Sequence, residues 1–200
     1  MDALHEHRAP SSAAQTGVWV GIATISMSFA AYTSAMIVRQ GAGADWQHFR
    51  LPPILYLNTL ILLASSATFE IGRRQMAHRR IARASTVEPL SAATPAERRW
   101  LLLTLVLGLA FLAGQLLAWR SLAHQGFYLA SNPSSSFFYI FTALHALHLL
   151  GGLGAIVYAM RLTRRPVTAA GAGALDAIGL YWHFMGVLWC YLLFILLIRL

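Results

Sequence analysis

The chain has 200 residues, of which 58% are hydrophobic and 11% are charged, and its mean hydropathy is +0.58. A typical soluble domain has about 25% charged residues, so this composition excludes an ordinary soluble protein. It also excludes a disordered chain, and the single cysteine, Cys190, excludes a secreted disulfide scaffold. The formal charge of +8 is compatible with nucleic-acid binding, but the positions of the basic residues give it another meaning.

Five apolar runs dominate the sequence, and each is long enough to cross a membrane as a helix. Such a helix needs about 20 apolar residues to span a core of about 30 Å, and it satisfies its own backbone hydrogen bonds. We therefore predict an all-α polytopic membrane protein, a bundle of five transmembrane helices. The predicted spans are residues 17–38, 51–72, 99–120, 136–160 and 177–198. We expect residues 17–200 to form one membrane domain, preceded by a polar N-terminal tail over residues 1–16.

Helix-start signals flank three of these spans. Residues 51–53 (Leu-Pro-Pro) place proline at the start of the second helix, where it costs no hydrogen bond. Residues 94–97 (Thr-Pro-Ala-Glu) match a capping box before the third helix. Residues 131–134 (Ser-Asn-Pro-Ser) separate the third and fourth spans. The arginine-rich segment 73–97 predicts that the second helix extends into water and then turns at Glu88-Pro89.

The distribution of arginine predicts the orientation in the membrane. The chain contains no lysine, and all 15 basic residues are arginine. If the N-terminus is cytoplasmic, 11 arginines fall in cytoplasmic segments and 4 fall outside, which follows the positive-inside rule. The odd number of spans then places the C-terminus outside. We therefore interpret the high charge as a topology signal and expect no nucleic-acid partner.

Polar side chains within the predicted spans gather on particular helix faces. They are costly in lipid, so they face other helices or a functional site. On the fourth span, Thr142, His145, His148 and Gly152 share one face at 100° per residue. Similar faces occur on three other spans. They are formed on the second span by Asn58 and Ser65 beside Thr59, Ser66 and Glu70, on the third by Gly108, Gln115 and Trp119, and on the fifth by His183, Gly186, Val187, Cys190 and Phe194. We predict that each is a packing face.

The membrane histidines permit a second interpretation, which is haem ligation. Two haem ligands must lie on different helices at a similar depth. From the predicted span ends, His148 lies about 18 Å and His183 about 6 Å from the inner end, a mismatch of about 12 Å. We therefore favour hydrogen bonding across helices or to lipid head groups. Cys190 has no second cysteine for a dinuclear copper site, so we predict a small packing residue.

Glu70 lies near the inner membrane boundary, three and four residues before Arg73 and Arg74. That spacing predicts an interfacial ion pair on one helix face, and a proton-handling carboxylate is the alternative. Six aromatic residues near span ends indicate an aromatic belt: Trp19, Trp46, Trp100, Trp119, Tyr181 and Trp182.

Two dense motifs occur in the last two spans. Residues 138–152 read FYIFTALHALHLLGG, and residues 181–189 read YWHFMGVLW. They resemble the F-Y-x-x-T-G-x-H-x-x-H-x-x-x-G and Y-W-H-F-x-D-x-x-W segments of the cytochrome c oxidase subunit III family. Two further helices of that family are similar to Asn58-Thr59 with Ser65-Ser66, and to Gly108 and Phe111 with Gln115. The resemblance covers residues 17–200 in the right order and implies the short five-helix bacterial form.

The resemblance implies a non-catalytic accessory subunit of a proton-pumping haem–copper terminal oxidase in the bacterial inner membrane. Such a subunit packs directly on catalytic subunit I, beside subunit II and other respiratory subunits, with a respiratory supercomplex as a further candidate assembly. It binds phospholipid and supports proton uptake and oxygen access, while haem and copper belong to its partners. The implied lipid or subunit-packing residues are Asn58, Thr59, Ser65, Ser66, Glu70, Arg73, Arg74, Gln115, Tyr139, Thr142, His145, His148, Gly152, Trp182, His183 and Trp189.

Three positions depart from the family's pattern. Ala143 replaces a glycine, Gly186 replaces the aspartate of the last motif, and Ile25 stands where the family has a membrane-embedded glutamate. The lost acids weigh against any role that needs a buried carboxylate, and they leave packing unaffected. Two alternatives within the family therefore stay open, a quinol oxidase subunit and a homologue associated with nitric oxide reductase.

A di-haem membrane cytochrome that uses His145, His148 and His183 is the alternative from another class of protein. The sequence shows neither the inverted repeats nor the broken helices of a small transporter. We expect the purified chain to show no Soret band, because the resemblance places no redox centre on it. A stoichiometric Soret band in the absorption spectrum of the chain alone would support the cytochrome instead.

Overall fold

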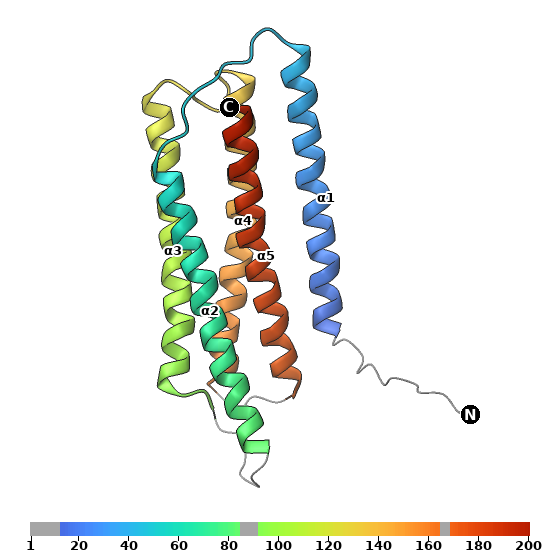
Figure 1. Ribbon diagram of the computed structural model, residues 1–200, viewed down its shortest axis with the longest axis vertical. Coiled ribbons are helices and arrows are strands. Elements are labelled where there is room, and N and C mark those ends of the chain that lie inside the picture. The colour runs from blue at the N-terminus through green and yellow to red at the C-terminus, as the bar shows by residue number, and fades with distance from the viewer. Residues whose placement is uncertain (1–12, 85–91, 165–168) are drawn as a thin grey trace, which may run out of the picture.

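Five long α-helices run side by side in the computed structural model, which describes residues 13–84, 92–164 and 169–200 (Figure 1). Their bounds are α1 Ala13–Ala42, α2 Ile54–Ala84, α3 Pro95–His124, α4 Pro133–Leu162 and α5 Ala169–Arg199. Each contains a stretch that is long and apolar enough to cross a membrane. The predicted all-α fold with five transmembrane helices is confirmed.

α5 occupies the centre of the arrangement. Its backbone approaches those of α1, α2 and α4, while α3 packs on α2 and α4. α1 lies at the edge of the bundle and approaches only α4 and α5 among the helices described (Figure 1). The end of α2, the start of α3, the end of α4 and the start of α5 all lie at the same end as the start of α1. This shared end carries the arginine-rich segments, and its cytoplasmic orientation stays a prediction.

Each helix extends beyond its predicted span at one end or both, because the sequence criterion marks mainly the apolar part. At its start α2 is shorter than predicted, since it begins at Ile54 and both prolines precede it. α2 continues through its arginines to Ala84, which confirms the predicted extension, and the turn predicted at Glu88-Pro89 lies outside the described residues. α1 begins at Ala13, so the last four residues of the predicted tail are helical. Residues 1–12 of that tail lie outside the described residues.

The largest error concerns α5, which begins at Ala169 instead of residue 177. Its first two turns are rich in alanine, which favours helix. Gly171, Gly173 and Asp176 weaken the apolar signal there, so the span was placed too late.

The predicted start signals of α3 and α4 are caps in the structure. Thr94 Oγ1 accepts a hydrogen bond from Glu97 N at 3.3 Å, and the Glu97 carboxylate accepts one from Thr94 N at 2.7 Å. This confirms the capping box. Asn132 caps α4 by accepting from Ser135 N at 2.8 Å, with proline in the first turn. These caps satisfy backbone donors that a helix start leaves without partners.

The core is built around Trp182, which is fully buried. A methyl group at Gly108 would lie 2.6 Å from Leu153 and 3.0 Å from the Trp182 ring, and one at Gly152 would lie 3.0 Å from the same ring. Glycine therefore lets α3 and α4 close around this indole, as small residues do in membrane bundles. The prediction that Trp182 belongs to an aromatic belt is wrong, because the early start of α5 moves it to mid-helix.

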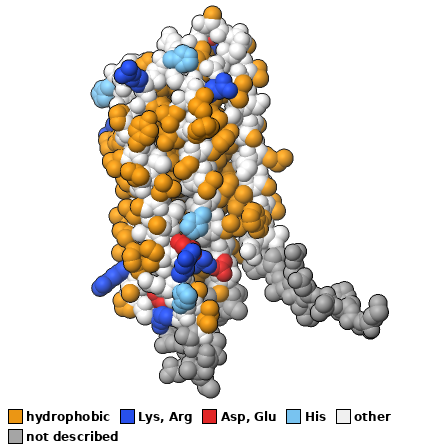
Figure 2. Space-filling model, in the orientation of Figure 1, with side chains coloured by type: hydrophobic (Ala, Val, Ile, Leu, Met, Phe, Trp, Pro, Cys, Tyr) orange, Lys and Arg blue, Asp and Glu red, His pale blue; other side chains and the backbone are white. Residues whose placement is uncertain are grey.

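The chain between α1 and α2 covers the end of α5. Phe49 N donates to Leu200 O at 3.1 Å, and Trp46 Nε1 donates to Arg199 O at 3.1 Å. An exposed ion pair between Arg39 and Asp45 lies beside this contact, and its hydrogen bond holds the pKa of Asp45 below its usual range. On the face shown in Figure 2, hydrophobic side chains cover the middle of the bundle and charged side chains gather toward its ends. That distribution fits a surface that lies in lipid.

We expect Gly108→Val to destabilise the bundle by about 1–3 kcal/mol, because the added methyl groups overlap Leu153 and the Trp182 ring. Gly154→Val is the matched control, since nothing lies within 4 Å of a methyl group there. Thermal unfolding in detergent, followed by tryptophan fluorescence, measures the difference. Equal unfolding temperatures for the two variants would contradict the packing assigned to Trp182.

Candidate functional site

The predicted polar faces of α2 and α3 meet each other. Ser65 Oγ donates to Thr104 O at 3.0 Å, and the Thr68 and Thr104 hydroxyls lie 2.9 Å apart. All three side chains are buried. Thr104 lies on the same face of α3 as Gly108 and Gln115, one turn earlier, so the helical spacing already pointed to it. These contacts join α2 to α3 through hydrogen bonds inside the membrane span.

Two tryptophan–threonine hydrogen bonds join further helix pairs. Trp119 Nε1 donates to Thr142 Oγ1 at 3.0 Å between α3 and α4. Trp189 Nε1 donates to Thr59 Oγ1 at 2.9 Å between α5 and α2. Tyr139 Oη also donates to Phe127 O at 3.0 Å, in the connection that follows α3. Motif residues therefore form direct contacts between four helices.

The three membrane histidines have different neighbours. His145 is fully buried, with its ring centroid 5.1 Å from that of Trp189 and 5.8 Å from that of Phe111. His148 is half-buried, and its Nδ1 lies 2.7 Å from Leu144 O on its own helix. Its ring faces α1, where the Phe29 centroid is 6.0 Å away.

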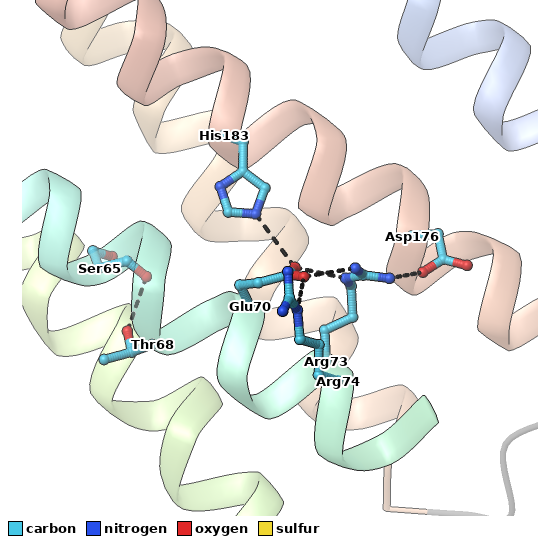
Figure 3. Close-up of polar contacts among 7 residues, drawn as sticks. All are labelled: Ser65, Thr68, Glu70, Arg73, Arg74, Asp176 and His183. Atoms are coloured by element: carbon cyan, nitrogen blue, oxygen red, sulfur yellow. Dashed lines mark hydrogen bonds and ion pairs between the residues drawn. The ribbon is translucent and has the colours of Figure 1, made fainter. Parts of the chain in front are cut away.

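His183 lies beside α2, and 40% of its side chain is exposed. Its Nε2 is 3.5 Å from Glu70 Oε2 (Figure 3). Because α5 begins at Ala169, His183 lies about 14 residues from the inner end of its helix, and so does His148 on α4. The predicted depth mismatch of about 12 Å is therefore wrong. Their directions separate the two imidazoles, since His148 faces α1 and His183 faces α2.

Glu70 is the centre of a charged network that connects α2 to α5 (Figure 3). It accepts two hydrogen bonds from Arg73 at 2.8 Å and one from Arg74. Arg73 Nη1 also donates to Asp176 Oδ1 at 2.8 Å, on the first turns of α5. The predicted ion pair at helical spacing is confirmed. The sequence did not predict a role for Asp176, because this residue lies before the predicted start of the fifth span.

The stripe predicted to be a packing face of α5 packs inside this chain only at its first two members, His183 and Gly186. Val187 is 67% exposed, Phe194 is 60% exposed and Cys190 is also exposed, so none of them packs inside this chain. Only Gly186 is buried, where a methyl group would lie 3.2 Å from Ser66 Oγ. Small and polar residues alone do not mark the face of α5 that is buried in this chain, because large apolar side chains fill most of it. The buried face of α5 includes Trp182, Met185, Leu188, Trp189, Leu192 and Leu196.

Other contacts between helices carried no signal in the sequence. Tyr191 Oη donates to Thr33 Oγ1 at 2.9 Å and joins α5 to α1, for which no polar face was predicted. Arg79 Nη1 donates to Glu97 Oε2 at 2.7 Å, so the glutamate of the capping box also binds α2. Neither contact can be predicted from local spacing, because the two partners of each lie on different helices.

Comparisons with known proteins identify a family for this chain. The family model for cytochrome c oxidase subunit III matches residues 20–199. The chain belongs to the cytochrome c oxidase subunit III family. It is therefore similar to subunits of haem–copper oxidases that work in respiration with other oxidase subunits, and its five apolar helices make it a multi-pass membrane protein.

Individual relatives carry names of two kinds. The chain is 33% identical to the probable cytochrome c oxidase subunit 3 of Mycobacterium bovis over 173 residues, covering 80% of this chain and 73% of that protein. It is 32% identical to cytochrome c oxidase subunit 3 of Corynebacterium diphtheriae, covering 76% and 68%. It is 28% identical to cytochrome bo(3) ubiquinol oxidase subunit 3 of Pseudomonas aeruginosa, covering 92% and 85%.

We expect Glu70→Ala to destabilise the α2–α5 contact by about 1–3 kcal/mol, because it leaves Arg74 and His183 without their carboxylate. The value is below that of a fully buried pair, since Glu70 is 21% exposed and Arg73 keeps Asp176. Asp45→Ala breaks an exposed ion pair and should change the unfolding temperature little. Thermal unfolding of the two variants in parallel measures this difference. An unfolding temperature that stays unchanged in the Glu70 variant would refute the stabilising role of this network.

Proposed function

We propose that this chain is the non-catalytic subunit III of a proton-pumping haem–copper oxidase, where it packs directly on catalytic subunit I and stabilises it. The observation that carries this proposal is the use of the family motifs. Thr59, Thr142 and Trp189 form hydrogen bonds between helices of this chain, and Gly152 packs on the Trp182 ring. Because these motif residues form contacts between helices, they support a scaffold role better than a catalytic one.

Haem and copper then reside on partner subunits. The donor set of this chain supports that assignment, because His145, His148 and His183 contact three different groups of neighbours. Paired haem ligation needs two imidazoles that face one space at one depth. The depths of His148 and His183 are similar, but their rings lie beside different helices.

We infer cytochrome c as the electron donor of the complex, because relatives at 33% and 32% identity are named cytochrome c oxidase subunits. A quinol donor is the second candidate, favoured by the Pseudomonas aeruginosa relative. We place the chain in the bacterial inner membrane with the arginine-rich end in the cytoplasm. Support of proton uptake and oxygen access belongs to the same proposal, as do contacts with subunit II.

Copurification in mild detergent tests the assembly. A tag on this chain should recover a haem- and copper-containing subunit in equal amount, because a scaffold subunit is bound stably to its catalytic partner. Removal of the chain should leave initial oxidase activity but speed the loss of activity during turnover. A chain that purifies alone, or an oxidase with the same turnover lifetime without it, would overturn the proposal.

We further propose that Arg73 and Arg74 bind phosphate groups of anionic lipid at the inner leaflet. The Arg74 side chain is 70% exposed beside the lipid-facing surface, and each basic residue there contributes about 1 kcal/mol. The double change of both arginines to alanine should lower retention of anionic lipid in native mass spectrometry. Glu70→Gln is the control, since it weakens the ion pairs but keeps both cations and should retain lipid. Unchanged retention in the double variant would rule out this site.

A further inference from the structure

Ser66 Oγ and Trp182 Nε1 are buried without a hydrogen-bond partner in the described part of the chain, and three other polar side chains inside the bundle have no partner for either polar atom. They are Asn58 on α2, Gln115 on α3 and His145 on α4, and their exposures are 1%, 2% and 0%. In each of them both polar atoms are unpaired among the described residues. Buried polar groups in native proteins nearly always have a partner, so three such residues in one bundle require an explanation.

The three residues lie at one level of the bundle. A methyl group at Gly114 would overlap the Asn58 amide, so Asn58 lies against α3 directly beside Gln115. One turn along α3, the Phe111 ring contacts the rings of both His145 and Trp189. Trp189 in turn donates to Thr59, the neighbour of Asn58. These contacts place Asn58, Gln115 and His145 at neighbouring levels of α2, α3 and α4.

Groups outside the chain are too large to supply the missing partners. Exposures of 0–2% leave no approach for a lipid head group or for a side chain of another subunit. Trp189 Nε1 already donates its hydrogen bond to Thr59 Oγ1, so it is not available as a partner for the three residues. Each amide offers two donors and one acceptor group, and a neutral imidazole offers one of each. The partner must therefore be small, and it must both donate and accept.

We propose that Asn58, Gln115 and His145 form an internal water site between α2, α3 and α4. Water is the molecule of that size and chemistry, and buried waters in proteins typically bond to two to four otherwise unpaired groups. Gly114 is part of the site, because a methyl group there would overlap the Asn58 amide in the position that it occupies. The bridge requires all three residues at one level, so it also fixes the register of the three helices.

A structure of the intact oxidase complex at a resolution that shows water tests this proposal. The expected result is enclosed density within about 2.7–3.2 Å of polar atoms from at least two of the three residues. Direct hydrogen bonds among the three side chains without such density would overturn the proposal. So would an enclosed space that holds no density.

Solid-state NMR of the full chain in lipid bilayers gives a second test that does not depend on variants. With histidine labelled with ¹⁵N, magnetisation from water should reach the His145 imidazole although the side chain is fully buried. Asn58→Leu keeps the side-chain size and should slow this transfer several-fold. Ser65→Ala is the matched control on α2, since Ser65 is buried but already bonded to Thr104, and it should leave the transfer unchanged. A His145 signal in the unaltered chain that receives no water magnetisation would refute the site.

Discussion

Close packing of Trp182 against Gly108 and Gly152 sets the distances between α3, α4 and α5, and the other contacts depend on it. Lipid tails are as apolar as leucine, so the hydrophobic effect does not hold membrane helices together. Complementary shape and hydrogen bonds between helices must therefore supply the free energy that holds the bundle together. With Trp182 in place, Trp189 two turns later reaches Thr59, and His183 on another face reaches Glu70.

The polar residues of the bundle have two kinds of environment. Toward the arginine-rich end, Glu70 and its arginines form a partly exposed network at the edge of α2 and α5. Nearer mid-bundle, Asn58, Gln115 and His145 are enclosed by the chain itself. The first environment suits lipid phosphate or a neighbouring subunit, and the second excludes any group larger than a water molecule. The proposed scaffold function uses both environments. The charged network contacts the surroundings of the chain, and the enclosed residues fix the register of its helices.

Helical periodicity and cap chemistry made much of this predictable. Glu70 with Arg73, the capping box at Thr94 and the buried side of Asn58 and Ser65 follow from local spacing, which the structure keeps. The start of α5 did not follow, since its alanine–glycine segment with Asp176 gives a weak apolar signal for a membrane span. That one error moved Trp182 toward a membrane surface and separated His183 from His148 in depth. Polar and small residues also did not mark most of the face of α5 that packs inside the chain, because large apolar side chains such as Trp182 and Trp189 fill it.

The central claim is that the membrane histidines of this subunit stabilise the bundle and bind no metal. Exchange of His145, His148 and His183 for glutamine, one at a time in the intact oxidase, tests it most directly. Haem absorption and the iron and copper content per complex are the measured quantities. The account predicts unchanged metal content and spectra for all three variants. Stoichiometric loss of iron or copper from any one of them would contradict it.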